Sequence, residues 1–431
     1  MSSQTPPIDV PSAAVTAPDH GARAKPIQVV FSQHRISAAC FQPTLKVNRP
    51  NPWRDVNLLV WHWGRRGAGP LYSLKMAEAL IHMLPGSVFL SYSRQSDYLE
   101  DFRELEGPRL EVDTFFTAVE GIRKTVRLPQ LRHQFARFIA ENRVDAVYCP
   151  MWHPWNAAMV GTLKKKRIPF ILTVHDAIRH EGDAGPFQRW VESYEQRHAD
   201  AFVALSEHVK RQLDSRRHRP RFGTTVIPHP NFSYATQDRA SSSSSETLKC
   251  LFIGRIRPYK GIGVLLDAFG QITRESEHDV VLTIAGSGDL QPYESKLSKL
   301  AGLDVRNKWL SDGECSQLMH SLDVVILPYL EASQSGVIAA ADGAGKPVVA
   351  FSVGGISEQI DHGVNGLVAA DRTPEGLARE VLRLADDKQL LAKLQEGARA
   401  SSGAGSTWAS SAESVLSLCT SIIAETSNSS R

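Results

Sequence analysis

The sequence predicts an α/β protein made of two Rossmann-like, parallel-sheet domains that follow one another along the chain. Three observations support this fold class. The chain has 431 residues, too many for one ordinary core and enough for two domains. Short apolar runs alternate with helix-like segments in both halves. A polar stretch at 233–246, SYATQDRASSSSSE, separates the halves. Strands that are separated by helices form mainly parallel sheets covered on both faces.

In the first half, apolar runs predict strands and amphipathic segments predict helices. The predicted strands are 27–32, 56–63, 88–92, 145–149, 169–174 and 201–205. Helices are expected over 71–84 and 129–142, and the second places Leu131, Phe135 and Ile139 on one face.

The same alternation restarts after the Ser-rich stretch. The predicted strands are 249–253, 280–285, 323–327 and 347–351, and the predicted helices are 262–273, 337–344 and 408–423. Thr373 followed by Pro374 predicts a further helix start, because Thr caps a helix and Pro is preset for its first position.

These patterns divide the chain into five expected parts. They are a disordered N-terminal segment (1–26), an N-terminal Rossmann-like domain (27–232), a linker (233–247), a C-terminal Rossmann-like domain (248–404) and a C-terminal helix with tail (405–431). Residues 1–26 lack the apolar run of a secretory signal, and no apolar run approaches the roughly 18 residues of a membrane span. Five scattered cysteines without CxxC spacing favour a reduced, cytoplasmic compartment.

Charge is distributed unevenly along the chain. Residues 1–230 hold 31 Lys and Arg against 22 Asp and Glu, and the remainder holds 18 against 24. The basic half is expected to meet an anionic partner, either a membrane surface or a phosphate-bearing acceptor, with the runs 164–167 and 216–221 as contact sites. A solvated basic surface is the alternative. Nucleic acid is not expected, because the basic residues are not interleaved with aromatics.

The stretch FIGRIRPYKG is typical of a phosphate-binding loop. A strand ends at Gly254, the cations Arg255 and Lys260 follow, and Gly261 leads into a helix. In doubly wound sheets ligands bind beyond the carboxyl ends of strands, where loop amides and helix N-termini face an anion. Two exposed cations without a ligand are the alternative.

A second loop of this type follows the strand that ends at Leu327. Ser335 and Gly336 stand at the start of the next helix, where a glycine lets an anion approach free N–H groups. A Ser-capped helix with a packing glycine is the alternative. Two such loops in one domain predict a nucleotide diphosphate. The sequence has no DxD and no clustered His and carboxylates, so no metal and no resident cofactor are expected.

The ordered set GRIRPYKG, IAGSGDL, DVVILPY, SQSGV, GKPVVAFSVGGISEQI and HGVNGLV resembles the retaining GT-B glycosyltransferases of glycosyltransferase family 4 (glycosyl transferases group 1). In the N-terminal half the likeness is thinner and rests on GRRGAGP, LTVHDA and DAFVALSEHVK. The resemblance implies two domains that face an interdomain cleft.

The resemblance also implies an enzyme of the hexosyltransferase type. It would transfer a sugar from a nucleoside-diphosphate sugar, as co-substrate, to a glycan or polyprenyl-diphosphate-linked acceptor, with retained anomeric configuration. Assembly of exopolysaccharide or another cell-surface glycan, at the inner face of the cytoplasmic membrane, is the expected setting.

Roles for single residues follow from the same resemblance. The expected catalytic residues are His175, which contacts the donor sugar, and Arg255 and Lys260, which stabilise the departing diphosphate. The other expected donor-binding residues are Gly67, Gly69, Gly254, Ser335, Gly336 and Glu358. For His175 the alternative is a residue that caps a βα loop, and for Glu358 it is a helix-start carboxylate.

One departure from the family pattern bears on activity. Ala332 and Ala340 stand where much of the family has two glutamates, the second of which contacts the ribose. A non-catalytic nucleotide-sugar-binding GT-B protein in a glycan assembly complex is therefore the alternative function, and an epimerase or inverting transferase is another. The presence of Arg255, Lys260 and His175 favours the enzyme.

Overall fold

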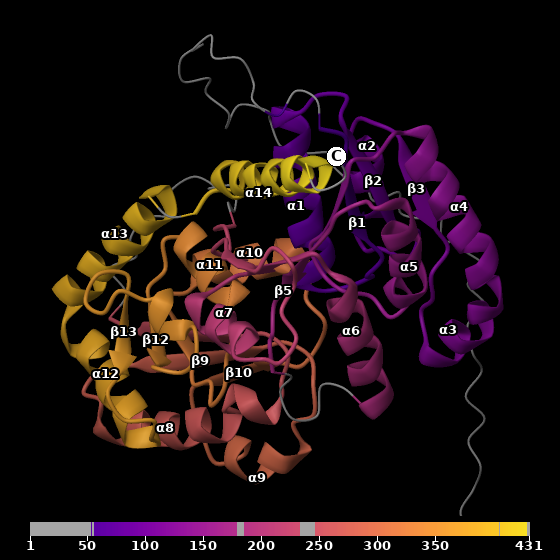
Figure 1. The fold of residues 1–431 in the computed structure, drawn as a ribbon. Helices are drawn as coiled ribbons and strands as arrows, with labels where there is room; N and C mark the ends of the chain where they lie inside the picture. Colours follow the sequence, from indigo (N-terminus) through magenta and orange to yellow (C-terminus); the bar gives the residue numbers. More distant parts are fainter. Residues whose placement is uncertain (1–52, 54–55, 179–184, 233–245, 405, 429–431) are drawn as a thin grey trace, which may run out of the picture. The chain divides into compact units, whose positions relative to one another are not determined.

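The computed structural model describes residues 53, 56–178, 185–232, 246–404 and 406–428, all within the unit of the chain that spans residues 49–431 (Figure 1). The predicted segment 1–26, the predicted strand 27–32 and nearly all of the predicted linker 233–247 lie outside the described residues.

The N-terminal lobe contains a parallel seven-stranded sheet, with the order β3-β2-β1-β4-β5-β6-β7 among the described residues. Its strands are β1 (Leu58–His62), β2 (Val88–Ser93), β3 (Arg109–Val112), β4 (Ala146–Cys149), β5 (Phe170–Val174), β6 (Ala201–Ala204) and β7 (Thr224–Val226). Its helices are α1 (Ala68–Met83), α2 (Leu99–Glu104), α3 (Ala118–Lys124), α4 (Leu128–Glu141), α5 (Asn156–Lys166), α6 (Pro186–His198) and α7 (Glu207–Asp214).

The C-terminal lobe contains a parallel six-stranded sheet, with the order β10-β9-β8-β11-β12-β13 among the described residues. Its strands are β8 (Leu248–Ile253), β9 (Val280–Ala285), β10 (Leu303–Arg306), β11 (Val324–Leu327), β12 (Val348–Phe351) and β13 (Gly366–Ala369). Its helices are α8 (Ile262–Glu275), α9 (Glu294–Leu297), α10 (Asp312–Ser321), α11 (Gly336–Gly343), α12 (Pro374–Asp386) and α13 (Lys388–Ala404).

The apolar residues of the N-terminal sheet are divided between its two faces. On one face Leu58 and Val60 of β1 pack in a cluster with α1 and the last helix, and on the other Leu59 and Trp61 pack in a cluster with α4 and α5. Side chains of a strand alternate between the faces, so a strand covered on both sides must be apolar throughout. This explains the uninterrupted run LLVWH.

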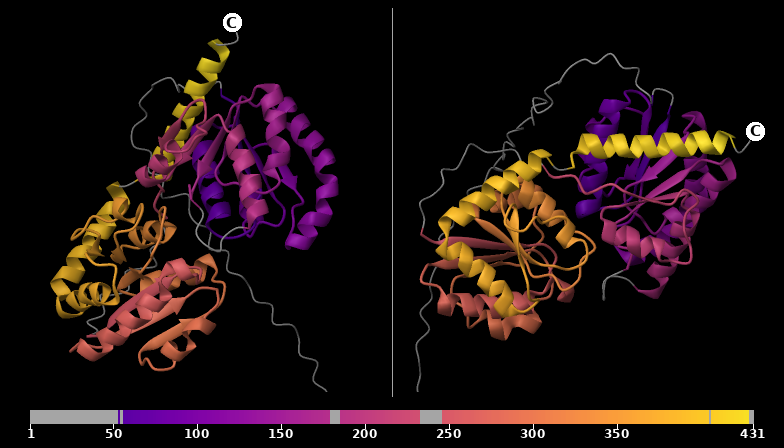
Figure 2. Two further views of the ribbon diagram at one scale, coloured as in Figure 1. Left: turned by 60° about the horizontal axis from the view of Figure 1, so that its bottom comes forward. Right: turned by 60° about the vertical axis from the view of Figure 1, so that its left-hand side comes forward.

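The last helix, α14 (Trp408–Asn428), packs on the N-terminal lobe although it follows the C-terminal lobe in sequence (Figure 2). It lies against α1, and its Ala412, Val415 and Leu416 are fully buried in the cluster that covers β1. The chain therefore crosses between the lobes twice, once after β7 and once before α14.

The predicted fold class is confirmed, and each predicted strand within the described residues is present with ends that agree within two residues. Four strands were missed: β3, β7, β10 and β13. All four are edge strands, and β3 (RLEV) and β10 (LDVR) alternate apolar with charged residues. An edge strand is covered on fewer sides, so its sequence lacks the continuous apolar run that identifies a central strand.

Candidate functional site

The two predicted phosphate-type loops of the C-terminal lobe lie in contact. Leu330, in the loop after β11, donates its N–H to the Tyr259 carbonyl oxygen at 2.8 Å. Gly261 has φ +73°, and a Cβ at this position would clash with the carbonyl group of Pro328. Only glycine combines this conformation with such a close approach, so Gly261 fixes one loop against the other.

The first of these loops, which follows β8, carries the two cations Lys260 and Arg255. Lys260 ends a short 3-10 helix, η3 (Pro258–Lys260), and its Nζ lies 3.5 Å from the ring centroid of the buried Tyr329. A cation over an aromatic face is held there electrostatically. Arg255 follows Gly254, whose φ is +138°, and is exposed. Arg255 forms no ion pair with the other described residues, so its exposed guanidinium can bind an anion.

Ser335 and Gly336 begin α11, as predicted, but Ser335 is already engaged. Its Oγ accepts the Val337 N–H at 3.2 Å, which makes it the helix cap. Its own N–H donates to Gln359 Oε1 at 2.7 Å, and Gln359 Nε2 donates back to the Ser335 carbonyl at 3.1 Å. Gln359 is a site neighbour that the sequence analysis missed. In this conformation Gly336, rather than Ser335, is the residue of the pair that can offer its amide to a ligand.

His175 follows β5 at the carboxyl end of the N-terminal sheet. Its Nε2 lies 2.8 Å from the Pro150 carbonyl oxygen, so Nε2 carries a proton. The ring lies 5.5 Å from that of buried Tyr72, which in turn lies 5.3 Å from the ring of His229. His229 Nε2 lies 3.7 Å from where a Cβ of Gly336 would stand. The structure therefore connects His175 to the start of α11 through the rings of Tyr72 and His229.

Two buried histidines flank this arrangement and were not predicted. His62 Nδ1 lies 3.3 Å from the Met151 carbonyl oxygen, and His229 Nδ1 lies 2.7 Å from that of Pro230. Burial lowers the pKa of each to about 4, and the neighbouring His175 contributes to the lowering. Both rings are neutral at pH 7. The sequence offers only WHW and PHP as signals, which are not specific.

The Gly-rich loop after β1 lies beside His62. A Cβ at Gly69 would clash with the Met151 side chain and would lie 3.3 Å from His62 Cε1. Gly67 has φ +85° and lies near Trp309 of the C-terminal lobe, which is 3.9 Å from the position of a Cβ. Both predicted glycines are therefore required by close packing or by backbone conformation.

Glu358 links the two lobes. It ends the 3-10 helix η5 (Ile356–Glu358), and its carboxylate accepts the N–H groups of Glu207 at 2.6 Å and His208 at 2.7 Å, in the first turn of α7. Next to it, Ser206 Oγ donates to the Ser333 carbonyl oxygen at 2.9 Å. The carboxylate thus caps a helix of the other lobe, and its role in donor binding stays a prediction.

The positions of the expected glutamate pair are filled by small buried side chains. Ala332 and Ala340 are both buried, and the Ala332 carbonyl oxygen accepts the Gly355 N–H at 3.2 Å. A Cβ at Gly354 would clash with that same carbonyl group. The loop is therefore packed tightly on the glycine pair of VGG, and these two positions supply no carboxylate.

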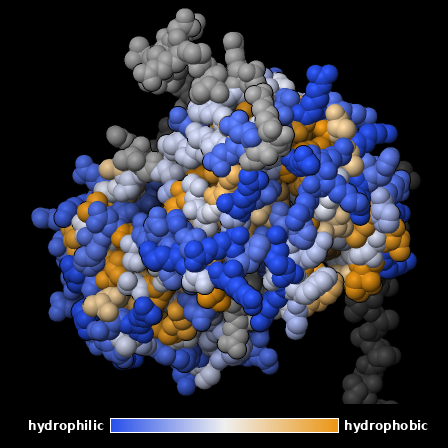
Figure 3. Space-filling model, viewed as in Figure 1, coloured by the Kyte–Doolittle hydropathy of each residue, from blue (hydrophilic) through white to orange (hydrophobic). Residues whose placement is uncertain are grey.

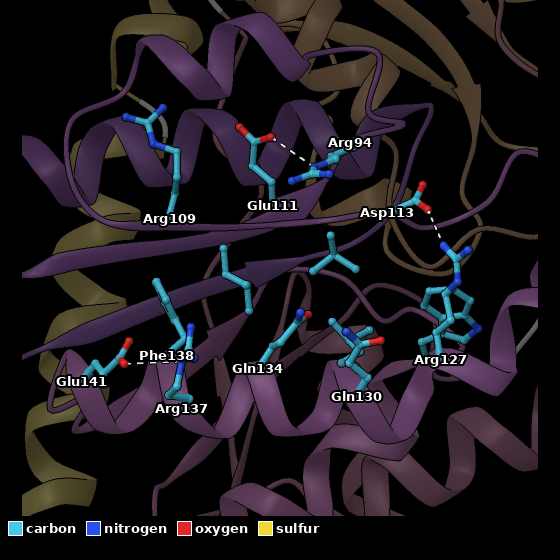
Figure 4. Close-up of a pocket in the computed structure, with 14 residues that line it drawn as sticks. Arg94, Arg109, Glu111, Asp113, Arg127, Gln130, Gln134, Arg137, Phe138 and Glu141 are labelled. Atoms are coloured by element: carbon cyan, nitrogen blue, oxygen red, sulfur yellow. Dashed lines mark hydrogen bonds and ion pairs between the residues drawn. The ribbon is translucent and has the colours of Figure 1, made fainter.

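A cavity of about 630 Å³ lies elsewhere, between β3 and α4 (Figure 4). Its wall is rich in charged side chains, several of which pair with one another: Arg94 Nε lies 3.4 Å from Glu111, and Arg127 lies 3.4 Å from Asp113. None of the predicted donor-binding residues lines this cavity. It is therefore separate from the site described above.

Two kinds of feature are absent from the described residues. They contain no group of three or more His, Cys, Asp or Glu side chains placed to hold a metal ion. Among the same residues, none of the helices has the length and apolar character needed to cross a bilayer.

The fold and the facing loops define the class of protein. Two Rossmann-like parallel-sheet lobes with loops gathered at the carboxyl ends of the strands are the GT-B architecture. The chain carries two glycosyltransferase domains within it: residues 94–230 match the family model described as Glycosyltransferase Family 4, and residues 247–387 match the model described as Glycosyl transferases group 1. The predicted resemblance is confirmed at the level of these domains.

Similar proteins agree with these matches. The chain is 27% identical over 272 residues to an uncharacterized glycosyltransferase of Methanocaldococcus jannaschii (57% of this chain, 67% of that protein). It is 25% identical over 245 residues to the alpha-D-kanosaminyltransferase of Streptomyces kanamyceticus (53% of this chain, 62% of that protein). The crystal structure of Anabaena HepE in complex with UDP and glucose has a TM-score of 0.66 at 17% identity, and the match covers 85% of this chain and 100% of that one. Each of the two sequence matches thus covers about two thirds, or less, of the relative's length.

Proposed function

We propose that this protein is a glycosyltransferase that moves a sugar from a nucleoside-diphosphate sugar to a hydroxyl of a glycan or lipid-linked acceptor, with retention of anomeric configuration. The observation that carries the proposal is the meeting of the two phosphate-type loops in the C-terminal lobe, with Lys260 and Arg255 on one and the start of α11 on the other. Binding of UDP and glucose by the structurally similar HepE supports a donor of this class.

The chemistry follows from where the charges lie. As the anomeric bond breaks, negative charge develops on the leaving diphosphate. Two cations and a helix N-terminus stabilise that charge better than water does, because they need not reorganise. In this proposal Arg255 takes two phosphate oxygens, Lys260 supplies a second charge, and the Gly336 amide contributes the end of α11.

His175 has a complementary role in the proposal. The Pro150 carbonyl orients the ring through Nε2, and a hydroxyl of the donor sugar hydrogen-bonds to the other ring nitrogen, Nδ1. That contact orients the anomeric carbon toward the acceptor. No protein nucleophile is assigned, and the leaving phosphate accepts the proton of the attacking hydroxyl.

The test is a panel of nucleoside-diphosphate sugars, measured by calorimetry and by transfer of radiolabelled sugar, on wild type, Arg255→Ala and Lys260→Ala. One donor should bind, and each variant should weaken binding by at least about tenfold, because a charge-assisted phosphate contact contributes about 1.5–3 kcal/mol. Arg274→Ala is the matched control: it removes an exposed cation from the other end of α8 and should leave affinity unchanged.

The outcomes separate the two functions considered for this chain. Binding with transfer to an added acceptor supports the enzyme. Binding that both variants weaken, with neither transfer nor donor hydrolysis, favours the non-catalytic sugar-nucleotide-binding protein that Ala332 and Ala340 suggested. If Arg274→Ala lost as much donor affinity as the loop variants, or if neither loop variant lost affinity, the diphosphate would bind elsewhere.

A further inference from the structure

A row of apolar side chains on the N-terminal lobe is exposed. Phe116 is 56% exposed, Val119 68%, Ile122 72% and Val126 79%. Val119, Ile122 and Val126 lie on α3 and the following 3-10 helix η2 (Thr125–Arg127) at intervals of three and four residues, which places them along one side; Phe116 lies just before the helix N-cap, Thr117. Figure 3 shows hydrophobic surface at the lower right, where Figure 1 places α3. Single exposed apolar residues are common on protein surfaces, but a continuous row indicates a binding surface.

The opposite side of α3 is firmly attached to the lobe. Gly121 packs against the ring of Phe115, which lies 3.0 Å from where a Cβ would stand. Lys124 Nζ forms ion pairs at 2.8 Å with both Asp113 and Glu120. These contacts hold the apolar row outward on a fixed element, and they neutralise both acidic groups that flank it.

Cations border the row. Arg123 and Arg132 are exposed, and the side chain of Arg127 is 67% exposed, with one contact to Asp113 at 3.4 Å. An apolar strip with arginines at its border suits the interface of a bilayer, where apolar side chains enter the acyl boundary and guanidinium groups meet lipid phosphates. The same combination is unfavourable for a partner with a basic surface.

The position of the row relates it to the site. α3 follows the carboxyl end of β3, the edge of the sheet at which His175 and the Gly-rich loop also lie. The guanidinium of Arg65, in that loop, stands 5.3 Å over the Phe116 ring. A membrane seated on α3 would therefore face the same edge as the donor.

Most of the basic residues in the runs 164–167 and 216–221 lie at the other edge of the sheet. Lys164, Lys165 and Lys166 end α5 just before β5, and Arg221 precedes β7, so these four residues stand at the amino ends of strands, whereas Arg216 reaches the Ala177 carbonyl oxygen after β5. Burial raises the pKa of Asp200, and the positive charges of Lys164 and Arg221 partly oppose that rise. A bilayer bound there would face away from the loops of the cleft.

We propose that Phe116, Val119, Ile122 and Val126 insert into the interfacial layer of an anionic membrane, with Arg123, Arg127 and Arg132 on its lipid phosphates. The inference deepens the proposed lipid-linked acceptor and rests on that function for its purpose. Vesicle binding, however, needs neither donor nor acceptor, so it can fail while sugar transfer to a soluble acceptor succeeds, and the reverse.

The test is flotation of the full chain with two kinds of vesicle, one of phosphatidylcholine alone and one that also contains about 30% phosphatidylglycerol. The anionic lipid gives the second kind a negative surface potential. Wild type should float with the anionic vesicles only. Ile122→Ser with Val119→Ser should reduce the partition coefficient at least about tenfold, because two apolar side chains lose their burial. Arg123→Gln and Arg132→Gln should each reduce it about fivefold.

Controls make the result specific. Val305→Ser alters an exposed apolar residue of edge strand β10 and should float like wild type, and Lys165→Gln tests the basic run at the opposite edge. Circular dichroism confirms that each variant is folded. The proposal is overturned if wild type does not float, if the α3 variants float normally, or if Lys165→Gln alone abolishes flotation. It is also overturned if sedimentation shows a dimer that Ile122→Ser dissociates, because the row would then bind a second copy of this chain.

Discussion

The two lobes share one architecture but differ in how they hold the loops at the carboxyl ends of their strands. In the C-terminal lobe the loops are fixed by backbone packed on backbone, as where Gly261 meets Pro328 and Gly354 meets Ala332. In the N-terminal lobe the corresponding edge is made of side chains, with the ring of Tyr72 next to those of His175 and His229. Backbone contacts present amides in a fixed geometry that suits a phosphate, whereas side chains can be exchanged without rebuilding the fold.

This difference explains why one lobe was easier to recognise. A loop that depends on glycine leaves a fixed spacing in the sequence, so GRIRPYKG and SQSGV are specific signals. A cleft wall of aromatic and imidazole rings leaves no such spacing, because the partners come from distant segments. We therefore expect changes in the C-terminal loops to act on donor binding and stability together, and changes in the N-terminal wall to act on turnover.

The largest effect is expected from Gly261→Ala. The new Cβ would meet the Pro328 carbonyl in a left-handed backbone, and the two costs together should exceed about 3 kcal/mol of unfolding free energy and abolish donor binding. Urea denaturation and calorimetry measure both. Gly86→Ala is the control: its φ is +82° but nothing lies within 4 Å, so it should lose only about 1–2 kcal/mol and bind normally. Equal losses in the two variants would contradict a backbone-fixed donor loop.

His175→Ala should separate binding from turnover. Removing one oriented contact to the donor sugar is expected to lower kcat about 100-fold, while affinity for the free nucleoside diphosphate changes less than about twofold. His175→Gln, which retains a side-chain donor toward the Pro150 carbonyl and an acceptor, should recover part of the rate. A variant that loses diphosphate affinity as strongly as Lys260→Ala would show that the lobes do not divide the work in this way.

Much of the fold followed from the sequence because both sheets have central strands buried on both faces, as LLVWH and VVIL show. Edge strands such as LDVR were not predicted, because their polar positions face solvent and interrupt the apolar run. At the site, the two phosphate-type loops could be predicted because each follows a buried strand, and the structure shows that they lie in contact. The engagement of the Ser335 amide by Gln359, and of Glu358 by α7, depends on how distant loops pack, which no local pattern encodes.

Each lobe also contains a buried carboxyl group with a raised pKa, Glu195 in one and Asp342 in the other, and pH should distinguish the two. Burial raises the pKa of Glu195 to about 8 and that of Asp342 to about 7, although Asn156 and Asn365 donate hydrogen bonds to them. Both groups bind a proton more tightly in the folded state than in the unfolded one. Stability should therefore fall as pH rises above the unfolded values of 4.5 and 3.8, until each folded pKa is passed.

Glu195→Gln removes the group with the larger pKa shift, and so the larger contribution to the pH dependence of stability. Wild type should lose about 2 kcal/mol from this group between pH 6 and pH 8, and the variant should lose correspondingly less. Urea unfolding at both pH values measures the difference. Asp342→Asn should flatten the profile mainly below pH 7, and Glu396→Gln, on an exposed face of α13, should not change it. An unchanged slope in Glu195→Gln would show that this carboxyl is ionised in the folded lobe.

The smallest effect is expected where the lobes meet. Glu358→Ala leaves two N–H groups at the start of α7 without their carboxylate, and loss of such a cap costs about 1 kcal/mol. Amide exchange at Glu207 and His208 should accelerate about fivefold, whereas exchange in α13 stays unchanged, because the cap acts only on the first turn. Glu396→Ala is the control for a lost surface carboxylate. If exchange at Glu207 and His208 stays slow in Glu358→Ala, the carboxylate does not hold the lobes together, and it becomes available for the donor contact that the sequence predicted.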